Sequence, residues 1–161
     1  GGSLRGIVQL SSGHRKVSKS VVNLINLESK LKLDKAYTLK HYINKIGKLK
    51  QKIQLQLYEI KKSGKRIVGY GAPAKATTLM YHFGLGPNIL DFIVDDSPLK
   101  QGLYSPGMYI PVFPSSTLYE KNPDYILILA WNFADSIINN HLAFSNAGGK
   151  FIIPLPEVVI V

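Results

Sequence analysis

Hydrophobic residues follow two different periods along this chain, and the change comes near residue 65. Before it they recur every three or four residues, which predicts a helix capped by Ser18 and a longer one that Asp34 caps and Gly64 ends. The longer helix has a narrow apolar stripe and many lysines, so we expect a surface or interdomain element. A weak alternation over residues 6–10 predicts a short strand before both helices.

After residue 65, short continuous apolar runs alternate with helical segments. The runs predict strands over 66–70, 90–94, 110–113, 125–130 and 151–153, with 158–161 returning beside the last one. Helices are expected over 73–83, 115–121 and 134–145. This alternation is typical of a parallel sheet covered on both faces. The predicted fold class is α/β: a Rossmann-like, doubly wound, mostly parallel five-stranded sheet of order 3-2-1-4-5, preceded by a short strand and helices.

Charge divides the chain at the same place. The net charge of +10 is the sum of +13 over residues 1–66 and −3 over residues 67–161, and all nine prolines follow residue 72. Any nucleic-acid surface would have to lie in the basic first part. Its lysines are spread around the predicted long helix without a reading face, so we expect no nucleic-acid partner.

Several classes of site are excluded by composition. The chain has no cysteine, which removes disulfides, thiolate zinc sites and cysteine nucleophiles, and its four histidines are scattered, so we expect no metal site. No apolar run reaches about 18 residues, and the start lacks the charged-then-apolar pattern of a signal peptide. We therefore expect no membrane partner and a cytoplasmic location, which the absence of cysteine also suits.

A glycine-rich turn follows the first strand of the predicted sheet. The run Gly69, Tyr70, Gly71, Ala72, Pro73, Ala74, Lys75 has the G-x-G-x-x-A spacing of a dinucleotide-binding turn. Exposed N–H groups at the following helix start form an anion site. Lys75 opposes the helix dipole there, so we expect an anionic ligand, or a carboxylate such as Asp95 or Asp96, to match its charge. The alternative is a tight turn with a solvated lysine.

Three further groups of candidates follow other strands. Asp95 lies 24 residues after Gly71, near the spacing of a ribose-binding acid, or it forms an Asx turn before Pro98. The loop over 98–109 either covers the sheet or offers side chains to a ligand: Lys100, Gln101 and Tyr104. Trp131, Asn132 and Phe133 follow the fourth strand, across the switch point from Gly71, and suit a base or sugar unless Trp131 caps the sheet. No acid–base pair has a recognisable spacing, so we expect no catalytic residue.

Six segments together resemble a known family. They are 69–75, 94–98, 100–102, 106–111, 123–132 and 148–156, and residues 1–5 add a seventh. In this order they are similar to the C-terminal domain of the S-adenosylmethionine-dependent sugar C-methyltransferases, which act on nucleotide-linked 4-keto-deoxysugars. The resemblance implies an upstream zinc module and an upstream methyltransferase domain that binds S-adenosylmethionine and carries catalysis. No cofactor is then expected in this chain itself.

The resemblance also implies an organisation and a function. Residues 1–33 would be the end of the methyltransferase domain and a linker, 34–64 a long basic linker helix, and 65–161 the Rossmann-like domain. This domain would help to bind the nucleotide sugar through the turn 69–75, Asp95, Lys100, Gln101, Trp131 and Asn132, and would pack on the upstream domain. Two alternatives stay open: an independent dinucleotide- or coenzyme A-binding module, and a structural or dimerisation domain.

Overall fold

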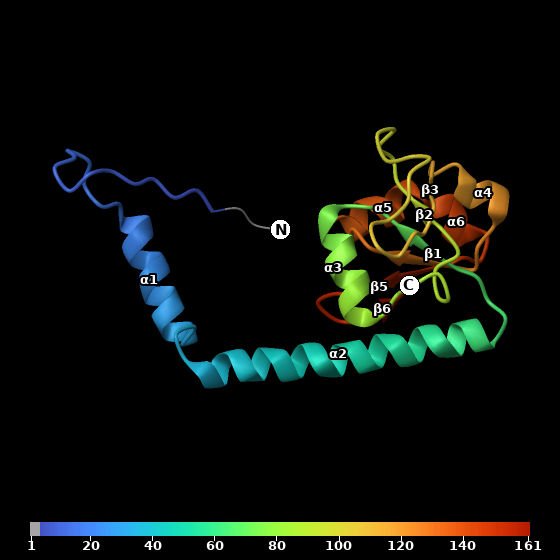
Figure 1. Ribbon diagram of the computed structural model, residues 1–161, viewed down its shortest axis with the longest axis horizontal. Coiled ribbons are helices and arrows are strands. Elements are labelled where there is room, and N and C mark those ends of the chain that lie inside the picture. The colour runs from blue at the N-terminus through green and yellow to red at the C-terminus, as the bar shows by residue number, and fades with distance from the viewer. Residues whose placement is uncertain (1–3) are drawn as a thin grey trace. The chain divides into compact units, whose positions relative to one another are not determined.

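The computed structural model describes residues 4–161, which form two compact units with their boundary between Gly47 and Lys48 (Figure 1). The first unit contains α1 (Lys19–Leu31) and the beginning of α2 (Ala36–Lys62). Ser18 is the N-cap residue of α1, as the sequence predicts, and Lys32 ends this helix with a left-handed backbone. Residues 1–3, part of the segment 1–5 in the family resemblance, lie outside the described residues.

The predicted short strand over residues 6–10 is wrong. These residues are exposed, and they pair with none of the strands that the structure describes. A lone strand leaves its backbone N–H and C=O groups without partners, and the weak alternation of this segment provides no apolar face to hold a neighbour. The segment is therefore irregular.

The second unit is built on the predicted sheet. Its strands are β1 (Ile67–Tyr70), β2 (Ile93–Val94), β3 (Val112–Phe113), β4 (Tyr125–Ile128), β5 (Lys150–Ile153) and β6 (Val159–Ile160). The spatial order is β3-β2-β1-β4-β5-β6, with β6 antiparallel to β5 and all other pairs parallel. The Rossmann-like α/β class is thus confirmed, and the predicted order 3-2-1-4-5 is extended by a sixth strand at the edge.

Helices follow the strands as expected, with one break. They are α3 (Ala74–Phe83), α4 (Thr117–Lys121), the 3-10 turn η1 (Trp131–Phe133), α5 (Ala134–Asn140) and α6 (Leu142–Asn146). The single helix predicted over 134–145 is wrong, because it is interrupted at His141, where φ is −122°. The imidazole of His141 is buried and bonded to two tyrosines, so the chain bends where this side chain is held.

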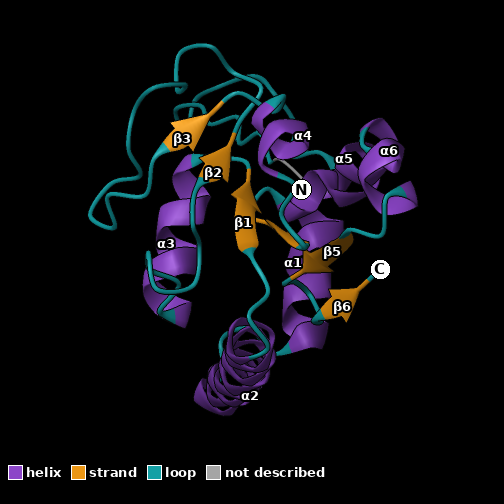
Figure 2. Ribbon diagram, turned by 90° about the vertical axis from the view of Figure 1, so that its right-hand side faces the viewer, coloured by secondary structure: helices purple, strands orange, loops and turns teal. Residues whose placement is uncertain are grey.

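Helices lie on both faces of the sheet, with α3 on one side and α4, α5 and α6 on the other (Figure 2). A hydrophobic cluster packs between the sheet and the helices on each side. Consecutive residues of a strand point to opposite faces, and the clusters divide accordingly. Ile67, Ile93 and Leu127 pack with residues of α2 and α3. Val68, Val94 and Ile126 pack with residues of α4, α5 and α6. The near-continuous apolar runs of the sequence are explained by this burial on both sides.

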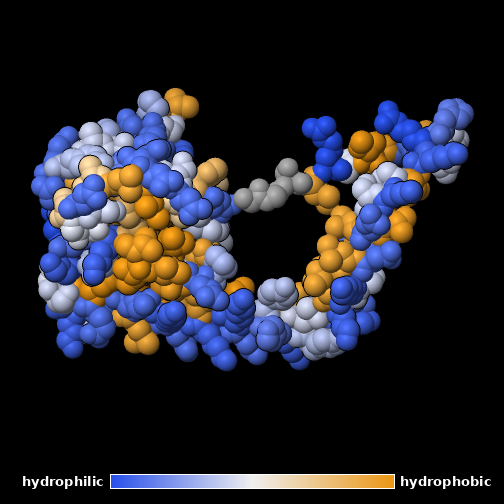
Figure 3. All heavy atoms as spheres, turned by 180° about the vertical axis from the view of Figure 1, so that it is seen from behind, coloured by the Kyte–Doolittle hydropathy of each residue, from blue (hydrophilic) through white to orange (hydrophobic). Residues whose placement is uncertain are grey.

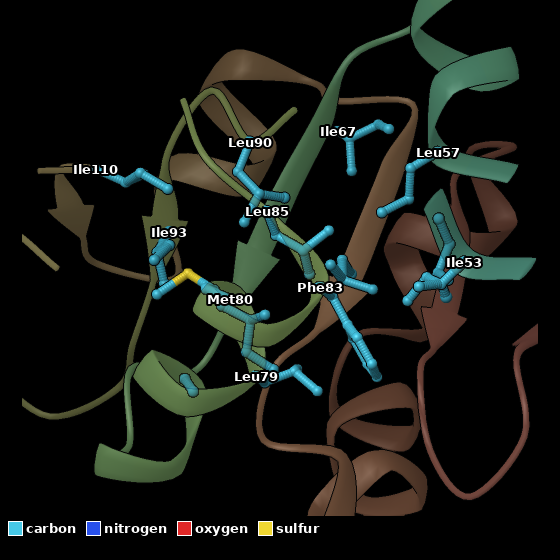
Figure 4. Close-up of a cluster of buried hydrophobic side chains, with 14 of the residues drawn as sticks. Ile53, Leu57, Ile67, Leu79, Met80, Phe83, Leu85, Leu90, Ile93 and Ile110 are labelled. Atoms are coloured by element: carbon cyan, nitrogen blue, oxygen red, sulfur yellow. The ribbon is translucent and has the colours of Figure 1, made fainter. Parts of the chain in front are cut away.

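The second half of α2 is part of the core. Ile53 and Leu57 are fully buried against Phe83 and Leu85, one turn apart on the helix (Figure 4). Polar contacts support the packing, because the Gln54 amide donates to the Phe83 carbonyl at 2.8 Å. The narrow apolar stripe predicted for this helix is, over residues 48–62, the surface that packs on the sheet.

Two surface properties complete the description. No helix within residues 4–161 combines the length and hydrophobicity needed to cross a bilayer. Figure 3 shows hydrophobic side chains gathered on the face of the sheet unit that carries β6 and the end of the chain. In this region Val159 and Val161 are about half exposed.

Replacing Leu57 by alanine tests the place of α2 in the core. Leu57 is fully buried, so Leu57→Ala should lower the free energy of unfolding by about 2–5 kcal/mol, through lost burial and the cavity left behind. The matched control is Leu55→Ala on the same helix, since Leu55 is 65% exposed and its loss should cost within about 0.5 kcal/mol. Urea unfolding measures both. Equal small effects would show that α2 does not pack on the sheet.

Candidate ligand-binding cleft

A cleft of about 310 Å³ opens where the strand order of the sheet reverses, between β1 and β4. The chain proceeds from β1 to β2 and β3 on one side and then returns to β4 and β5 on the other, so β1 and β4 form the switch point. Side chains from the ends of β1, β2 and β4 and from α5 surround the cleft: Tyr70, Gly71, Pro73, Asp95, Asp96, Lys100, Ala130, Phe133, Ser136, Ile137 and Asn140. Ligands of open α/β sheets bind at this position.

A larger groove of about 480 Å³ lies elsewhere, between α2 and the loop after α3. Its walls come from Gln51, Gln54, Leu55, Leu57, Tyr58, Gly84, Leu85, Asn88 and Ile89. No charged side chain lines it, and it lies away from the carboxyl ends of the strands. Convergent polar groups mark binding sites better than size alone, so the switch-point cleft is the candidate site.

The two glycines of the turn have different roles. Gly71 has φ +90°, and a Cβ there would lie 2.6 Å from the Ala130 Cβ, so only glycine lets the ends of β1 and β4 approach this closely. A Cβ on Gly69 would lie 2.8 Å from Leu129 Cδ1, within the sheet. Gly71 therefore shapes the cleft, whereas Gly69 serves packing and does not line it.

Asp95 joins the glycine turn to the loop after β2. Its Oδ2 accepts the Ala72 N–H at 2.7 Å and the Lys100 ammonium at 3.0 Å, and its Oδ1 accepts the Ser97 N–H at 2.9 Å. Gln101 donates its amide to the Asp95 backbone carbonyl at 2.9 Å. Burial raises the pKa of Asp95, but the three donors to its carboxylate outweigh burial and hold that pKa below its usual value. We name this arrangement, Asp95 with Ala72, Ser97 and Lys100, the carboxylate clamp.

The clamp has the geometry of the Asx turn that was the alternative for Asp95, because the Ser97 N–H bonds to its carboxylate. Both oxygens of this carboxylate are engaged within the protein. Lys100 and Gln101 are likewise occupied by Asp95, although Lys100 also lines the cleft. Asp95, Lys100 and Gln101, three of the predicted binding residues, thus contact one another and hold the loop after β2 in place.

Lys75 is matched by aromatic rings and not by a carboxylate. Its Nζ lies 4.3 Å from the centroid of the Trp131 ring and 5.9 Å from that of Phe133. Within residues 4–161 it forms no ion pair, so the expected pairing with Asp95 or Asp96 in this chain is wrong. Lys100 takes that place at Asp95 because it follows in the same loop. Phe133 lines the cleft, whereas Lys75 and Trp131 are not among its lining residues. The Lys75 ammonium lies beside the cleft through its contact with Phe133.

A polar network extends from Tyr70 and Asp96, which line the cleft, into the protein. The Tyr70 hydroxyl donates to Asp96 Oδ2 at 2.8 Å and lies 2.9 Å from His141 Nε2, and the Tyr119 hydroxyl lies 2.8 Å from His141 Nδ1. Burial, and next the bond to Asp96, raise the pKa of Tyr70. Burial lowers the pKa of His141, and the charge of Asp96 opposes that shift in part. Sequence reasoning missed this network because its members are far apart in the chain and follow no known spacing.

The remaining candidates lie around the cleft. Ala74 begins α3, and Asn132 is exposed in η1 outside the cleft lining. Tyr104 lines a smaller cavity of about 210 Å³ under the loop 98–109, which shares Pro73 and Lys100 with the cleft. Ser105, 3% exposed, anchors that loop by accepting the Ile110 N–H at 3.0 Å. Residues of α5 that line the cleft, Ser136 and Asn140, carried no sequence signal.

Comparison with known proteins identifies relatives. The family model of the C-methyltransferase C-terminal domain matches residues 1–156. The C-methyltransferase NovU of Streptomyces niveus is 40% identical over 111 residues, which are 66% of this chain and 26% of that protein. The chain therefore spans about a quarter of the length of the curated relative that it matches.

Replacing Asp95 by asparagine tests the clamp. Asp95→Asn removes the charge that its three donors stabilise, so the free energy of unfolding at pH 7 should fall by about 1.5–3 kcal/mol. Because the folded-state pKa is lowered, the stabilisation is complete above the unfolded-state pKa of about 3.9 and is lost as the pH falls through the folded-state pKa. The difference in the free energy of unfolding between wild type and Asp95→Asn, which we call the stability gap, should therefore become smaller in acid.

Urea unfolding of both proteins at pH 7, 5 and 3 measures this gap. The pKa of Asp124 is lowered as well, first by the Arg66 N–H and then by Lys65, but Asp124 is present in both proteins and cancels in the difference. Asp135→Asn is the control, because Asp135 is exposed. A gap that stays the same at all three pH values would mean that the charge of Asp95 does not stabilise the fold.

Proposed function

Because this chain belongs to the C-methyltransferase C-terminal domain family, we propose that it is the accessory domain of an S-adenosylmethionine-dependent sugar C-methyltransferase. It holds a nucleotide-linked 4-keto-deoxysugar in the switch-point cleft. An upstream domain of the same protein binds S-adenosylmethionine and carries catalysis.

The observation that carries this proposal is the cleft itself. Its volume of about 310 Å³ falls at the lower end of the usual range for small-molecule sites, and it lies where open α/β sheets bind ligands. Cation, carboxylate, amide and aromatic side chains converge on it from four elements. A nucleotide sugar offers a matching set of groups: phosphates, hydroxyls and a flat base.

The charges around the cleft support a proposed position for each of these groups. The N–H groups of Ala74 and Lys75 begin α3 and favour an anion, whereas the Ala76 N–H already donates to the Pro73 carbonyl at 2.9 Å. The Lys75 ammonium adds a cation in the same turn. The Lys100 ammonium is already paired with Asp95 and contributes less. Phosphates therefore belong near Lys75, the base near the Trp131 and Phe133 rings, and hydroxyls near Asp96, Ser136 and Asn140.

The residues of this chain fit neither expected cofactor. Zinc needs a set of cysteine, histidine or carboxylate ligands, yet the chain has no cysteine, and residues 4–161 contain no cluster of three such groups. The acidic residue followed by G-x-G-x-G that the family resemblance implies for S-adenosylmethionine binding is also absent from this sequence. Both cofactors accordingly belong to the upstream domains.

The chemistry of the reaction supports this division. Methylation of a carbon beside a ketone needs a base that forms the enolate. A raised pKa keeps the Tyr70 hydroxyl protonated, and both nitrogens of His141 are engaged by tyrosines. Neither group is free to accept a proton from a substrate, which supports a role of this chain in binding and orientation.

Titration calorimetry with the full chain tests the proposal. A nucleoside diphosphate hexose should bind more tightly than the nucleoside diphosphate or the hexose alone, because both halves occupy the cleft. S-adenosylmethionine should bind no more tightly than about 1 mM. Tighter binding of NAD or coenzyme A than of any nucleotide sugar would favour an independent Rossmann module, and binding of none of them would favour a structural domain. Methyl transfer to a 4-keto sugar by residues 1–161 alone would contradict the division of roles.

Replacing Lys75 by alanine tests the anion site. Loss of a charged hydrogen bond should weaken nucleotide-sugar binding by about 1.5–3 kcal/mol. Stability should change by less than about 1 kcal/mol, because the lost contact with Trp131 and the relieved dipole conflict oppose each other. Lys62→Ala removes the same charge at an exposed position of α2 and is the control. Unchanged affinity with a large loss of stability would assign Lys75 a structural role.

A further inference from the structure

Asp96 differs from its neighbour Asp95 in what it contacts. It is exposed and lines the cleft, whereas Asp95 is 7% exposed. Within residues 4–161 its carboxylate accepts one hydrogen bond, from the Tyr70 hydroxyl to Oδ2, and forms no ion pair. Its Oδ1 therefore has its acceptor capacity free at the wall of the cleft.

When His141 is neutral, the hydrogen bonds behind Asp96 can run in only one direction. A carboxylate accepts and does not donate, so the single hydroxyl proton of Tyr70 goes to Asp96. The Tyr70 oxygen must then accept the proton of His141 Nε2, and the bare Nδ1 accepts the hydroxyl proton of Tyr119. In this arrangement each hydrogen-bonding atom is used once, and the neutral imidazole of His141 carries its proton on Nε2. The lowered pKa of His141 agrees with this form.

The chain of bonds is built from three separate elements. Tyr70 ends β1, Tyr119 lies in α4, and His141 interrupts the helix between α5 and α6. Tyr70 and His141 are 4% and 8% exposed, so the fold buries polar groups here that apolar residues would replace at lower cost. A rotating surface carboxylate has no need of such support, but a carboxylate that must face a ligand in one orientation does.

We propose that Asp96 binds a hydroxyl group on a sugar ring of the ligand, and that Tyr70, His141 and Tyr119 are positioning residues that orient its carboxylate. This rests on the proposed function, because it assumes a nucleotide sugar in the cleft. Oδ2 is held by Tyr70, and Oδ1 accepts the ligand hydroxyl. Since a carboxylate repels phosphate, Asp96 also selects the direction in which the ligand enters, with its phosphates toward Lys75.

Binding of a nucleoside diphosphate hexose to variants of the full chain tests the positioning. Asp96→Asn keeps the size and should weaken binding about 10- to 100-fold, the range for hydrogen bonds to charged groups. Tyr70→Phe and Tyr119→Phe, which each remove one oxygen, should weaken it about 2- to 10-fold. The double variant Asp96→Asn/Tyr70→Phe should bind no more weakly than Asp96→Asn, because Tyr70 acts through Asp96. Tyr58→Phe, at an exposed position of α2, is the control and should bind as the wild type does.

The outcomes separate this proposal from the proposed function. Wild-type binding that Asp96→Asn leaves unchanged overturns the role of Asp96 and retains the cleft, and additive losses in the double variant overturn the positioning role of Tyr70. Failure of the wild type to bind any nucleotide sugar overturns both proposals. If Asp96→Asn weakens the nucleoside diphosphate as much as the nucleotide sugar, the hydroxyl belongs to the nucleotide ring; if only the nucleotide sugar is weakened, it belongs to the hexose.

A second measurement needs no ligand. Nitrogen-15 chemical shifts of His141 distinguish the two neutral tautomers, and the wild type should show the proton on Nε2 near neutral pH. Tyr70→Phe removes the acceptor of that proton and should shift the population toward the Nδ1 form. A wild-type His141 protonated at Nδ1 would reverse the direction of the bonds and overturn the positioning chain.

Discussion

One buried carboxylate holds together the two loops from which the cleft is built. Asp95 follows β2, and its oxygens fix the Ala72 N–H of the glycine turn, the Ser97 N–H of its own loop and the Lys100 ammonium. Gly71 makes this closure possible, because its positive φ lets the turn pass against Ala130 without a side chain. Without the carboxylate, the Ala72 N–H and the Lys100 ammonium would lose their partner beside the cleft.

The clamp also decides what is left for a ligand. By pairing with Lys100, it leaves the Lys75 ammonium, in the first turn of α3 beside the cleft, without a carboxylate partner within residues 4–161. By turning Asp95 inward, it leaves the next residue, Asp96, at the cleft wall, where Tyr70 holds it. A cation beside the cleft and a carboxylate at its wall suit a ligand with phosphates at one end and hydroxyls at the other. This polarity supports the binding role proposed for this C-methyltransferase C-terminal domain.

The sheet could be predicted because burial on both faces requires continuous runs of apolar residues, which are easily recognised in a sequence. Strands such as 125–128 are apolar at every position, and glycine or proline ends the segments between them. The turn at 69–75 and Asp95 were found by spacing, since a glycine turn and the acid after β2 belong to one local unit. The resemblance to the methyltransferase family added the function class, which the residues alone left open.

What could not be predicted depends on contacts between distant parts of the chain. Residues 6–10 alternate weakly but find no partner strand, and periodicity does not report a missing partner. Lys75 stacks on Trp131, 56 positions later, although local electrostatics suggested a carboxylate. His141 bonds to Tyr70, which lies 71 positions earlier, and to Tyr119, which lies 22 positions earlier. Its role is therefore visible only once β1 and α4 are in place. Side-chain networks of this kind follow from the fold and leave no period in the sequence.

The most direct test of the central claim, that the switch-point cleft is the ligand site, is the mapping of backbone amide chemical shifts during titration with a nucleoside diphosphate hexose. The account predicts that the perturbed amides cluster at Gly71, the first turn of α3, Asp96 and the beginning of α5, and that they saturate with a single affinity. Perturbations confined to the groove beside α2, at Gln54 and Leu85, or no saturable change at all, would contradict it.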